Sequence, residues 1–295
     1  MSGLQWTRKT TAKIARQLQR LGIVVSRNTV GRLRRQMKYS LRTHRKQIAT
    51  RSSPDRDRQF RYLRRQRERF EKRGDPVVSV DAKKRELMGN FKNPGVKWEQ
   101  SSTPVNDHDF RSQAVGIGIP YGIYQTQTHR GCIFLGISHE TSAFAVSSLR
   151  QGWQREGPRR SPRARHLLIL ADTGGSNGSQ RGAWKQEIQR QRCDRLGLRI
   201  TVCHSPTGAS KWNPMEHRLF SEISKNWAAE PLDSDEKALK FIRTTKTTTG
   251  LKVTAYLDTA YYPTGVKISQ QEMAELSIHP KRVLPKWNYT IVPRM

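Results

Sequence analysis

Apolar residues recur at helical spacing in two short segments near the N-terminus, TTAKIARQLQRLG (10–22) and SRNTVGRLRRQMKY (26–39). Gly22 is placed to end the first helix, and Ser26 is a good N-cap for the second. Two short helices around a glycine predict a helix-turn-helix within residues 1–40. The same pattern allows a small basic helical hairpin that only packs on the rest of the chain. The apolar positions are Ile14, Ala15, Leu18 and Leu21 in the first segment and Val30, Leu33 and Met37 in the second.

An arginine-rich helix is predicted from Pro54 to Lys72, after a polar and basic stretch whose lack of periodicity predicts a linker. Linker and helix together make up residues 41–75. Ser53 is expected to cap this helix, and Gly74 lies beyond its end. Its apolar stripe can dock the helix on the rest of the chain or form a seam with a second copy, and the sequence does not separate the two. The stripe consists of Phe60, Leu63, Phe70 and the stem of Arg67.

After Pro76 the pattern changes to short apolar strands that alternate with helices. One strand, then a hairpin, then strands alternating with helices predict a mixed α/β sheet with helices on both faces. That order matches the ribonuclease H-like fold, which we expect over residues 76–250. The tail, 251–295, is expected to extend this domain with short strands or irregular structure. The predicted strands are 77–80, 116–125, 131–137, 166–171 and 198–204, and the predicted helices are 141–157, 181–197 and 214–228.

Charge is strongly positive and unevenly distributed. The chain carries 55 Lys plus Arg against 24 Asp plus Glu, a formal net charge of +31, and residues 1–54 contain no acidic side chain. Such a field favours a polyanionic partner, which could be a nucleic acid or a membrane surface. No apolar run approaches the roughly 20 residues of a membrane-spanning helix, and no signal-peptide pattern follows Met1. We therefore expect an intracellular protein that binds nucleic acid.

Three acidic residues stand in contexts that suit a metal site: Asp81 in VVSVDAKK, Asp172 in LLILADTGGSNG and Glu216 in SKWNPMEHR. The two aspartates end strands that neighbour each other in the predicted sheet, about 4.8 Å apart, so their carboxylates can share one space at its rim. Like charges repel unless a cation neutralises them, and oxygen ligands favour magnesium or manganese. Glu216, in the first turn of the following helix, can complete the site. The pattern predicts that these three acids bind two Mg²⁺ or Mn²⁺ ions and catalyse phosphodiester displacement.

Each acid also has a structural interpretation. Asp81 could pair with one of the two lysines that follow it. Asp172 could be a turn former ahead of TGGSNG, whose glycines permit positive φ. Glu216 could cap its own helix, because Asn213 and Glu216 occupy the N-cap and N3 positions of a near capping box. The conjunction of all three acids favours the catalytic interpretation.

DNA-contacting residues are predicted in two places. In a helix-turn-helix, the first residues of the second helix meet base edges in the major groove, while basic residues contact phosphates. Near the third acid, Lys211 could touch a phosphate and Trp212 could stack on an unpaired base at a DNA end. Asp107, His108 and Asp109 could form a further metal cluster, although a polar loop is the commoner explanation. The predicted base readers are Arg27, Asn28, Thr29 and Arg32, and the predicted phosphate contacts are Arg34, Arg35 and Lys38.

Several blocks of the sequence resemble those of known transposases. The run SKWNPMEHRLF resembles the Asn-Pro-x-Glu segment that supplies the last acid in mariner-like and related insertion-sequence transposases. The chain is more closely similar to the ISAzo group of bacterial transposases, also called the Rhodopirellula-type DDE transposases, from about residue 4 to the C-terminus. The blocks that carry this resemblance include VSVDAKKRELMGNFKNPG, VNDHDF, LILADTGGSNG, ITVCHSPTGASKWNPMEHRLF and YPTGVKIS.

The resemblance implies that Asp81, Asp172 and Glu216 form a DDE triad, spaced by 91 and then 44 residues. It implies binding to double-stranded DNA at the terminal inverted repeats of an element, hydrolytic nicking at its ends and strand transfer into target DNA. A homodimer is expected by analogy, in the bacterial cytoplasm with the nucleoid. Family members usually carry another DNA-binding segment before the helix-turn-helix, so a truncated reading frame with an intact catalytic core is also an expectation.

The sequence therefore predicts an insertion-sequence transposase. Two alternatives stay open: a truncated remnant that only binds DNA, and a ribonuclease H-like nuclease that shares the site but not strand transfer. The intact triad favours catalysis over the remnant, and the family blocks favour transposition over a simple nuclease.

Overall fold

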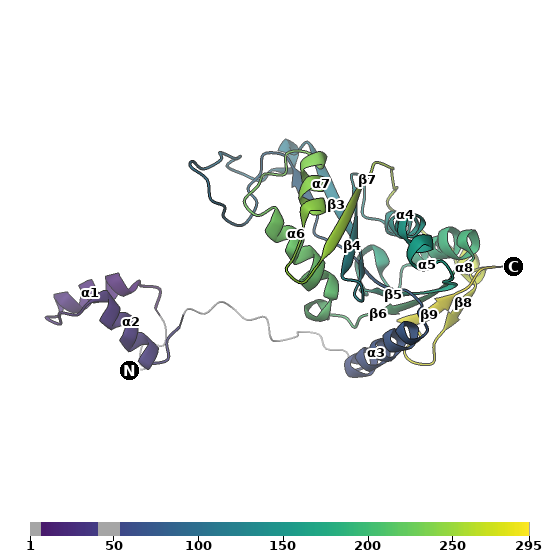
Figure 1. The fold of residues 1–295 in the computed structure, drawn as a ribbon, viewed down its shortest axis with the longest axis horizontal. Helices are drawn as coiled ribbons and strands as arrows, with labels where there is room; N and C mark the ends of the chain where they lie inside the picture. The colour runs from purple at the N-terminus through teal and green to yellow at the C-terminus, as the bar shows by residue number, and fades with distance from the viewer. Residues whose placement is uncertain (1–6, 41–53, 295) are drawn as a thin grey trace. The chain divides into compact units, whose positions relative to one another are not determined.

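The computed structural model describes residues 7–40 and 54–294, and the chain divides into two units, Met1–Thr50 and Arg51–Met295 (Figure 1). The predicted linker falls almost entirely on residues 41–53, outside the described residues, as does the expected cap at Ser53.

The described part of the first unit consists of two helices, α1 (Thr11–Arg20) and α2 (Arg27–Gln36). Gly22 has a φ of 79°, the left-handed conformation that ends a helix without strain in glycine. The hydroxyl of Ser26 accepts a hydrogen bond from the backbone N–H of Thr29 and caps α2, as predicted. Val30 is the only buried side chain among residues 7–40, so the interior of this unit is small.

Five strands form the centre of the sheet in the second unit. β1 lies in the middle, antiparallel to β3 on one side and parallel to β5 on the other. β4 continues the sheet beyond β3 as an antiparallel hairpin, and β6 continues it beyond β5 in parallel. This order, β4-β3-β1-β5-β6, is the mixed arrangement predicted for a ribonuclease H-like sheet. The strands are β1 (Val77–Ala82), β3 (Gly116–Gln125), β4 (Arg130–Gly136), β5 (His166–Ala171) and β6 (Arg199–His204).

The C-terminal tail supplies strands to both edges of the same sheet. β7 (Lys252–Asp258) pairs in parallel with β4 at one edge. At the other edge, β9 (Asn288–Ile291) pairs with β6, and β8 (Ile278–Pro280) pairs with β9. A short strand, β2 (Glu86–Met88), pairs with β3 outside this path. Residues 251–295 are therefore part of the sheet and its surroundings.

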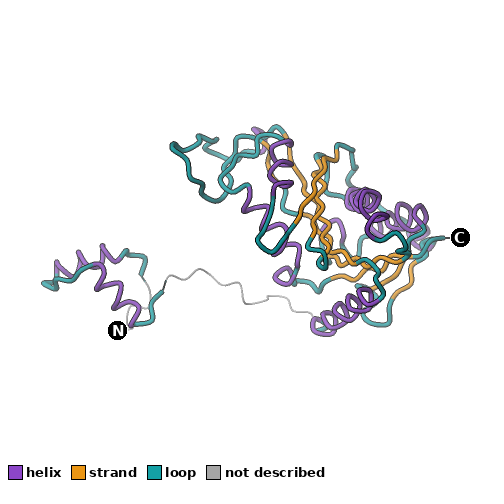
Figure 2. The backbone as a smooth tube through the Cα atoms, in the orientation of Figure 1, coloured by secondary structure: helices purple, strands orange, loops and turns teal. Residues whose placement is uncertain are grey.

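One face of the sheet is covered by α4 (Ser142–Arg160) and α5 (Gly182–Ile188), which continues into a π-helical turn, Gln189–Asp194. Phe144 of α4 and Trp184 of α5 are fully buried in one hydrophobic cluster with alternate residues of β1 and β5. Figure 2 shows these helices on one side of the strands. In the described part of the chain, no helix, α4 included, is long and apolar enough to cross a membrane.

The opposite face carries a second group of helices. α3 (Arg56–Lys72) packs on β1 and β5, while α6 (Ser221–Asn226) and α7 (Asp235–Thr244) cover β3, β4 and β7 (Figures 1 and 2). α3 begins at Arg56 after Asp55, which makes no side-chain capping bond, so the predicted start at Pro54 was two residues early. A small helix, α8 (Gln270–Ala274), follows in the tail.

α3 is docked on the sheet by both apolar and polar contacts. Phe70 is buried against Val77 of β1 and Leu168 of β5. Gln59, which is fully buried, donates from Nε2 to the backbone oxygen of His204 and to Oδ1 of Asn288, both at 2.8 Å. Because a buried amide left without these partners costs about 1–3 kcal/mol, the contact fixes α3 at this site. The stripe predicted from the sequence therefore serves intramolecular docking.

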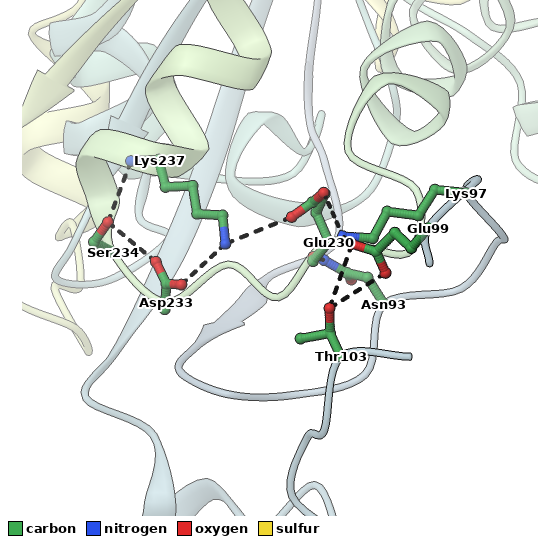
Figure 3. A network of polar contacts seen from close by, with 8 residues as sticks. All are labelled: Asn93, Lys97, Glu99, Thr103, Glu230, Asp233, Ser234 and Lys237. Atoms are coloured by element: carbon green, nitrogen blue, oxygen red, sulfur yellow. Dashed lines mark hydrogen bonds and ion pairs between the residues drawn. The ribbon is translucent and has the colours of Figure 1, made fainter. Parts of the chain in front are cut away.

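The segment between β2 and β3 is tied to the connection between α6 and α7 by a polar network (Figure 3). Lys97 Nζ lies 2.7 Å from Glu230 Oε1, and Asn93 Nδ2 donates to the Glu230 backbone oxygen at 2.7 Å. Lys237 Nζ reaches Asp233 at 2.9 Å and Glu230 at 3.6 Å. The network holds the segment between β2 and β3 against the helices that cover β3.

Gly122 on β3 lets the chain segment that leads into α6 lie directly on the sheet. A Cβ atom at this position would come within 2.5 Å of Met215 Cε and 2.8 Å of Phe220 Cε1. Gly122 is also the register partner of Asp81 on β1. The absence of a side chain here therefore sets how closely the segment with Met215 approaches the strand position opposite Asp81.

We expect Gly122→Ala to lower the free energy of unfolding by about 1–3 kcal/mol, because its methyl group would displace Met215 and the ring of Phe220. Gly116→Ala is the control, since it lies on the same strand in open space and should change stability by less than about 0.5 kcal/mol. Urea unfolding of both variants measures the difference. Equal losses would contradict the close-approach explanation.

Candidate active site

Asp81 and Asp172 lie next to each other at one end of the sheet and on the same face. Val80 of β1 is in register with Ala171 of β5, a parallel pair, so the residues that follow are neighbours. Val80 and Ala171 both point into the hydrophobic cluster under α4 and α5. Because side chains alternate along a strand, the next residues face the opposite side, where α3 and α6 lie. The geometry brings together these two predicted residues.

The carboxylate of Asp81 is held by one hydrogen bond to each oxygen. Oδ1 accepts from the backbone N–H of Ala82 at 2.8 Å, and Oδ2 accepts from Nδ2 of Asn213 at 2.6 Å. Burial, followed by the charge of the neighbouring Asp172, raises the pKa of Asp81 to about 7. Lys83, one of the two lysines that could have paired with Asp81, instead binds Glu86. Asp81 is thus a partly buried acid whose negative charge is opposed by its surroundings.

Asp172 begins a loop that is anchored in the interior. Its Oδ1 accepts from the backbone N–H of Thr173 at 2.7 Å. Five residues after Asp172, the buried Asn177 accepts a hydrogen bond at Oδ1 from the hydroxyl of Tyr121 on β3 at 3.0 Å. The glycine-rich segment is therefore a fixed turn as well as the continuation of an acid-bearing strand, and the turn-forming interpretation made from the sequence applies to Asp172.

A chain of buried hydrogen bonds connects the protein interior with the backbone oxygen of Asp172. Nε1 of Trp184 donates to the hydroxyl of Tyr289 at 3.1 Å, and that hydroxyl lies 3.2 Å from Nε2 of His204. Nδ1 of His204 lies 2.8 Å from the backbone oxygen of Asp172. A carbonyl can only accept, so Nδ1 carries the proton and Nε2 accepts from Tyr289. Burial lowers the pKa of His204 to about 4, so the ring is neutral at pH 7 and this tautomer is fixed.

Glu216 lies in a π-helical turn, Glu216–Phe220, that leads into α6. Oδ1 of Asn213 accepts from the backbone N–H of Met215 at 3.0 Å, which caps this helical segment. The reciprocal bond from Glu216 is missing: its side chain is exposed and makes no hydrogen bond or ion pair with any residue that the structure describes. The near capping box expected from the sequence does not form. Glu216 therefore keeps both oxygens free, and its charge contributes to the raised pKa of Asp81.

This set of donors fits a divalent cation in its chemistry. Two adjacent carboxylates whose charges oppose each other are relieved by a positive ion, and their oxygens are the ligands that magnesium and manganese prefer. Within residues 7–40 and 54–294, no group of three His, Cys, Asp or Glu side chains is arranged to hold a metal ion. Asp81 and Asp172 are thus the paired acids, and Glu216 stands near them on the helical layer.

Trp212, which was predicted to stack on an unpaired base, is accessible. Trp184 and Trp227 are buried in the interior, while Trp212 is 54% exposed. The guanidinium of Arg56 lies 4.2 Å from the centre of a Trp212 ring, and Phe60 lies 5.8 Å away. The first turn of α3 and the segment before Glu216 therefore meet at Trp212. The neighbouring Lys211 is exposed.

The predicted helix-turn-helix contacts all lie in or directly after α2, in the first unit. Thr29 is half-buried, and its hydroxyl lies 3.0 Å from that of Ser26 as part of the helix cap. Arg34 is also half-buried. Exposed and available to a partner are Arg27, Asn28, Arg32, Arg35 and Lys38.

The block Asp107–His108–Asp109 is an exposed loop. Nδ1 of His108 lies 3.2 Å from Asp107 Oδ2, and its ring stacks on Phe110 with 5.1 Å between ring centres. These are local contacts of a polar loop, and the group is not among arrangements that could hold a metal within the described residues.

Sequence reasoning missed the residues that orient the acids. Asn213 was expected only to cap a helix, yet it also binds Asp81, which is 132 positions away. His204 and Tyr121 carried no recognisable signal, because each acts through a contact with a distant segment. The Asn-Pro-x-Glu spacing was the one available signal for Asn213.

Solved structures with a similar fold include three complexes of the Mos1 transposase. A paired-end complex with the left transposon end matches with a TM-score of 0.46 and 15% identity, over 82% of this chain and 72% of that one. A pre-cleavage transpososome gives 0.49 and 16%, over 79% and 66%. A mariner Mos1 paired-end complex with Mn gives 0.47 and 16%, over 79% and 65%. At these values the similarity carries no weight for function.

The comparison with curated proteins found no match. A family model, in contrast, covers nearly the whole sequence: the Rhodopirellula transposase DDE domain matches residues 1–293. The three acids fall within this match, two of them paired at the end of adjacent strands. The chain therefore belongs to the family of Rhodopirellula-type DDE transposases.

Proposed function

We propose that this protein is a DNA transposase that binds the ends of its element, nicks phosphodiester bonds there and joins the 3′-hydroxyl ends to target DNA. One observation carries the proposal. Asp81 and Asp172 end adjacent parallel strands on the same face of the sheet, and the segment that bears Glu216 packs over that face. Family membership supports the same conclusion.

The proposed cofactor is a pair of Mg²⁺ or Mn²⁺ ions, with Asp81, Asp172 and Glu216 as their ligands. When bound, such ions stabilise negative charge on the attacking and leaving oxygens of the phosphodiester. Asp81 would present an oxygen that Asn213 orients, and Asp172 would present its carboxylate from a backbone that His204 holds. Glu216 has no partner to give up among the residues that the structure describes. Water is the nucleophile for nicking, and a 3′-hydroxyl is the nucleophile for joining.

End recognition is assigned to α2, where the exposed Arg27, Asn28 and Arg32 stand in the first turns and can meet base edges. Thr29 is the fourth proposed reader, and Arg34, Arg35 and Lys38 are the proposed phosphate contacts. In the second unit, Lys211 and Trp212 are proposed to contact DNA beside the acids. The net charge of +31 supports a polyanionic partner for both units.

Transposition joins two ends of one element, so we propose a homodimer that acts on double-stranded DNA, at terminal inverted repeats and at a target. For a protein with this substrate, the proposed location is the bacterial cytoplasm, in association with the nucleoid. The competing functions are a DNA-binding remnant without activity and a ribonuclease H-like nuclease.

Replacing Asp172 by Asn should abolish magnesium-dependent cleavage and joining of DNA that carries the inverted repeats flanking its own gene. Loss of residues that merely orient metal ligands costs about 10–100-fold, so loss of a ligand should exceed about 100-fold. Asp107→Asn is the matched control, because Asp107 lies in an exposed loop, and it should keep full activity.

The products separate the three functions. Full cleavage by Asp172→Asn would refute the triad assignment. A native chain that binds DNA but yields no product would indicate the inactive remnant, and cleavage without joined product would indicate a nuclease.

Arg32→Ala should reduce the preference of the protein for inverted-repeat DNA over unrelated DNA by about 1–3 kcal/mol, because a base contact contributes to discrimination. Arg16→Ala on α1 removes an equally exposed arginine and should leave that preference unchanged. Competition binding with both DNA sequences measures the ratio. An equal loss on both sequences would show that Arg32 contacts phosphate.

A further inference from the structure

A cavity of about 370 Å³ opens at the end of the sheet remote from the acids, between the C-terminal end of α3 and strands β5, β6 and β8. Its walls carry basic side chains from four separate segments of the chain. We call this cavity the basic cleft, and its basic residues are Arg69, Arg73, His166, Arg199, His279 and Lys281.

The positive charges of the basic cleft are those of Arg69, Arg73, Arg199 and Lys281, whereas burial lowers the pKa of His166. These four charges are largely uncompensated. Arg73 pairs with Asp75 at 2.8 Å, and no other cleft cation forms an ion pair among the residues that the structure describes. Burial, and after it the charges of Arg69 and Arg199, lower the pKa of Lys281. Cations that crowd one another in this way are stabilised by an anionic ligand that spans several of them.

α3 connects the basic cleft with the acids. Near its N-terminus, Gln59 binds the backbone oxygen of His204, the last residue of β6, at 2.8 Å. Near its C-terminus, Arg69 lines the cleft together with Arg199, the first residue of β6. α3 therefore runs antiparallel to β6, from the end of the strands that carries the acids to the end that carries the cleft.

The separation of the two sites suits a DNA duplex. β5 begins at His166, in the cleft, and ends immediately before Asp172. Six residues of a strand span about 20 Å, and successive phosphates of one DNA strand are about 3.4 Å apart along the helix axis. For a duplex that runs parallel to β5, this distance corresponds to about five or six base pairs between the cleft and the bond on which the acids would act. Between the two, the outer side of α3 exposes further arginines, Arg58, Arg61, Arg64 and Arg65.

We propose that the basic cleft binds the phosphodiester backbone of duplex DNA about five or six base pairs from the reacting bond, so that this part of the duplex lies along α3. The inference rests on the proposed function for the position of the reacting bond. The cleft itself is a phosphate-binding site of the second unit, separate from both α2 and the three acids.

The first test measures binding of the full chain to a 30-base-pair duplex of mixed sequence, by fluorescence anisotropy in EDTA over a series of NaCl concentrations. The variant Arg69→Ala/Arg199→Ala/Lys281→Ala removes three cleft charges. Each lost phosphate contact makes the negative slope of log K against log salt shallower by about 0.9, so the magnitude of the slope should fall by about 2–3. The control, Lys240→Ala/Lys246→Ala/Lys252→Ala, removes three exposed charges near the opposite edge of the sheet and should change the slope by less than about 1.

Equal changes in the two triple variants would overturn the proposal, because the cleft would then contribute only to the general positive field. A charge-conserving variant, Arg69→Lys/Arg199→Lys/Lys281→Arg, should keep most of the slope. If it loses as much slope as the alanine variant does, the loss reflects altered folding, and the proposal would be refuted in favour of a structural role.

A second test locates the contact. Single neutral methylphosphonates are placed along DNA that carries the element's own end, and binding is again measured in EDTA. A methylphosphonate five or six base pairs from the reacting bond should weaken DNA binding by the native chain several-fold. It should hardly change DNA binding by the alanine triple variant. Parallel responses of the two proteins would refute the location. If neutral positions weaken binding in this way but the native chain cleaves no DNA, the cleft is confirmed as a DNA-binding site and the proposed function is refuted.

Discussion

The register between β1 and β5 is the constraint on which the site depends. It places Asp81 and Asp172 side by side, and alternation along the strands turns both to the same face. Burial of Asp81 and, after it, the charge of the neighbouring Asp172 raise the pKa of Asp81 to about 7. An arrangement that opposes two negative charges is poor for stability alone and well suited to binding a cation.

The surrounding structure keeps this pair in place. Gly122, opposite Asp81 in register, permits close approach of the segment that carries Asn213 and Glu216. Asn213 caps that segment with one amide atom and binds Asp81 with the other, so the helix start and the acid are coupled directly. On the other strand, the buried His204 holds the backbone of Asp172. The site is built from interior contacts, and the acids themselves contribute little to the core.

Much of the central fold could be predicted from the sequence, because runs such as VVSV and HLLILA are apolar, short and bounded by turn residues. The two paired aspartates followed from their positions after such strands. The strand order at both sheet edges could not be predicted, since β7 and β9 pair with strands more than 80 residues earlier. The start of α3 was misplaced because Pro54 is a good first helical residue, and the structure instead begins the helix at Arg56. The spacing of Asn213 and Glu216 also allowed a capping box, which does not form: Asn213 accepts from Met215 and donates to Asp81, and Glu216 makes no reciprocal bond among the described residues.

The most direct measurement of the central claim is iron-dependent cleavage of the polypeptide. Fe²⁺ can replace magnesium at oxygen ligands, and with ascorbate and peroxide it cuts the backbone close to where it is bound. If Asp81, Asp172 and Glu216 share one metal site, the full chain should be cut near all three residues, and excess Mg²⁺ should suppress the three cuts together. Cuts near Asp81 and Asp172 without one near Glu216, or cuts that Mg²⁺ does not suppress, would contradict the account.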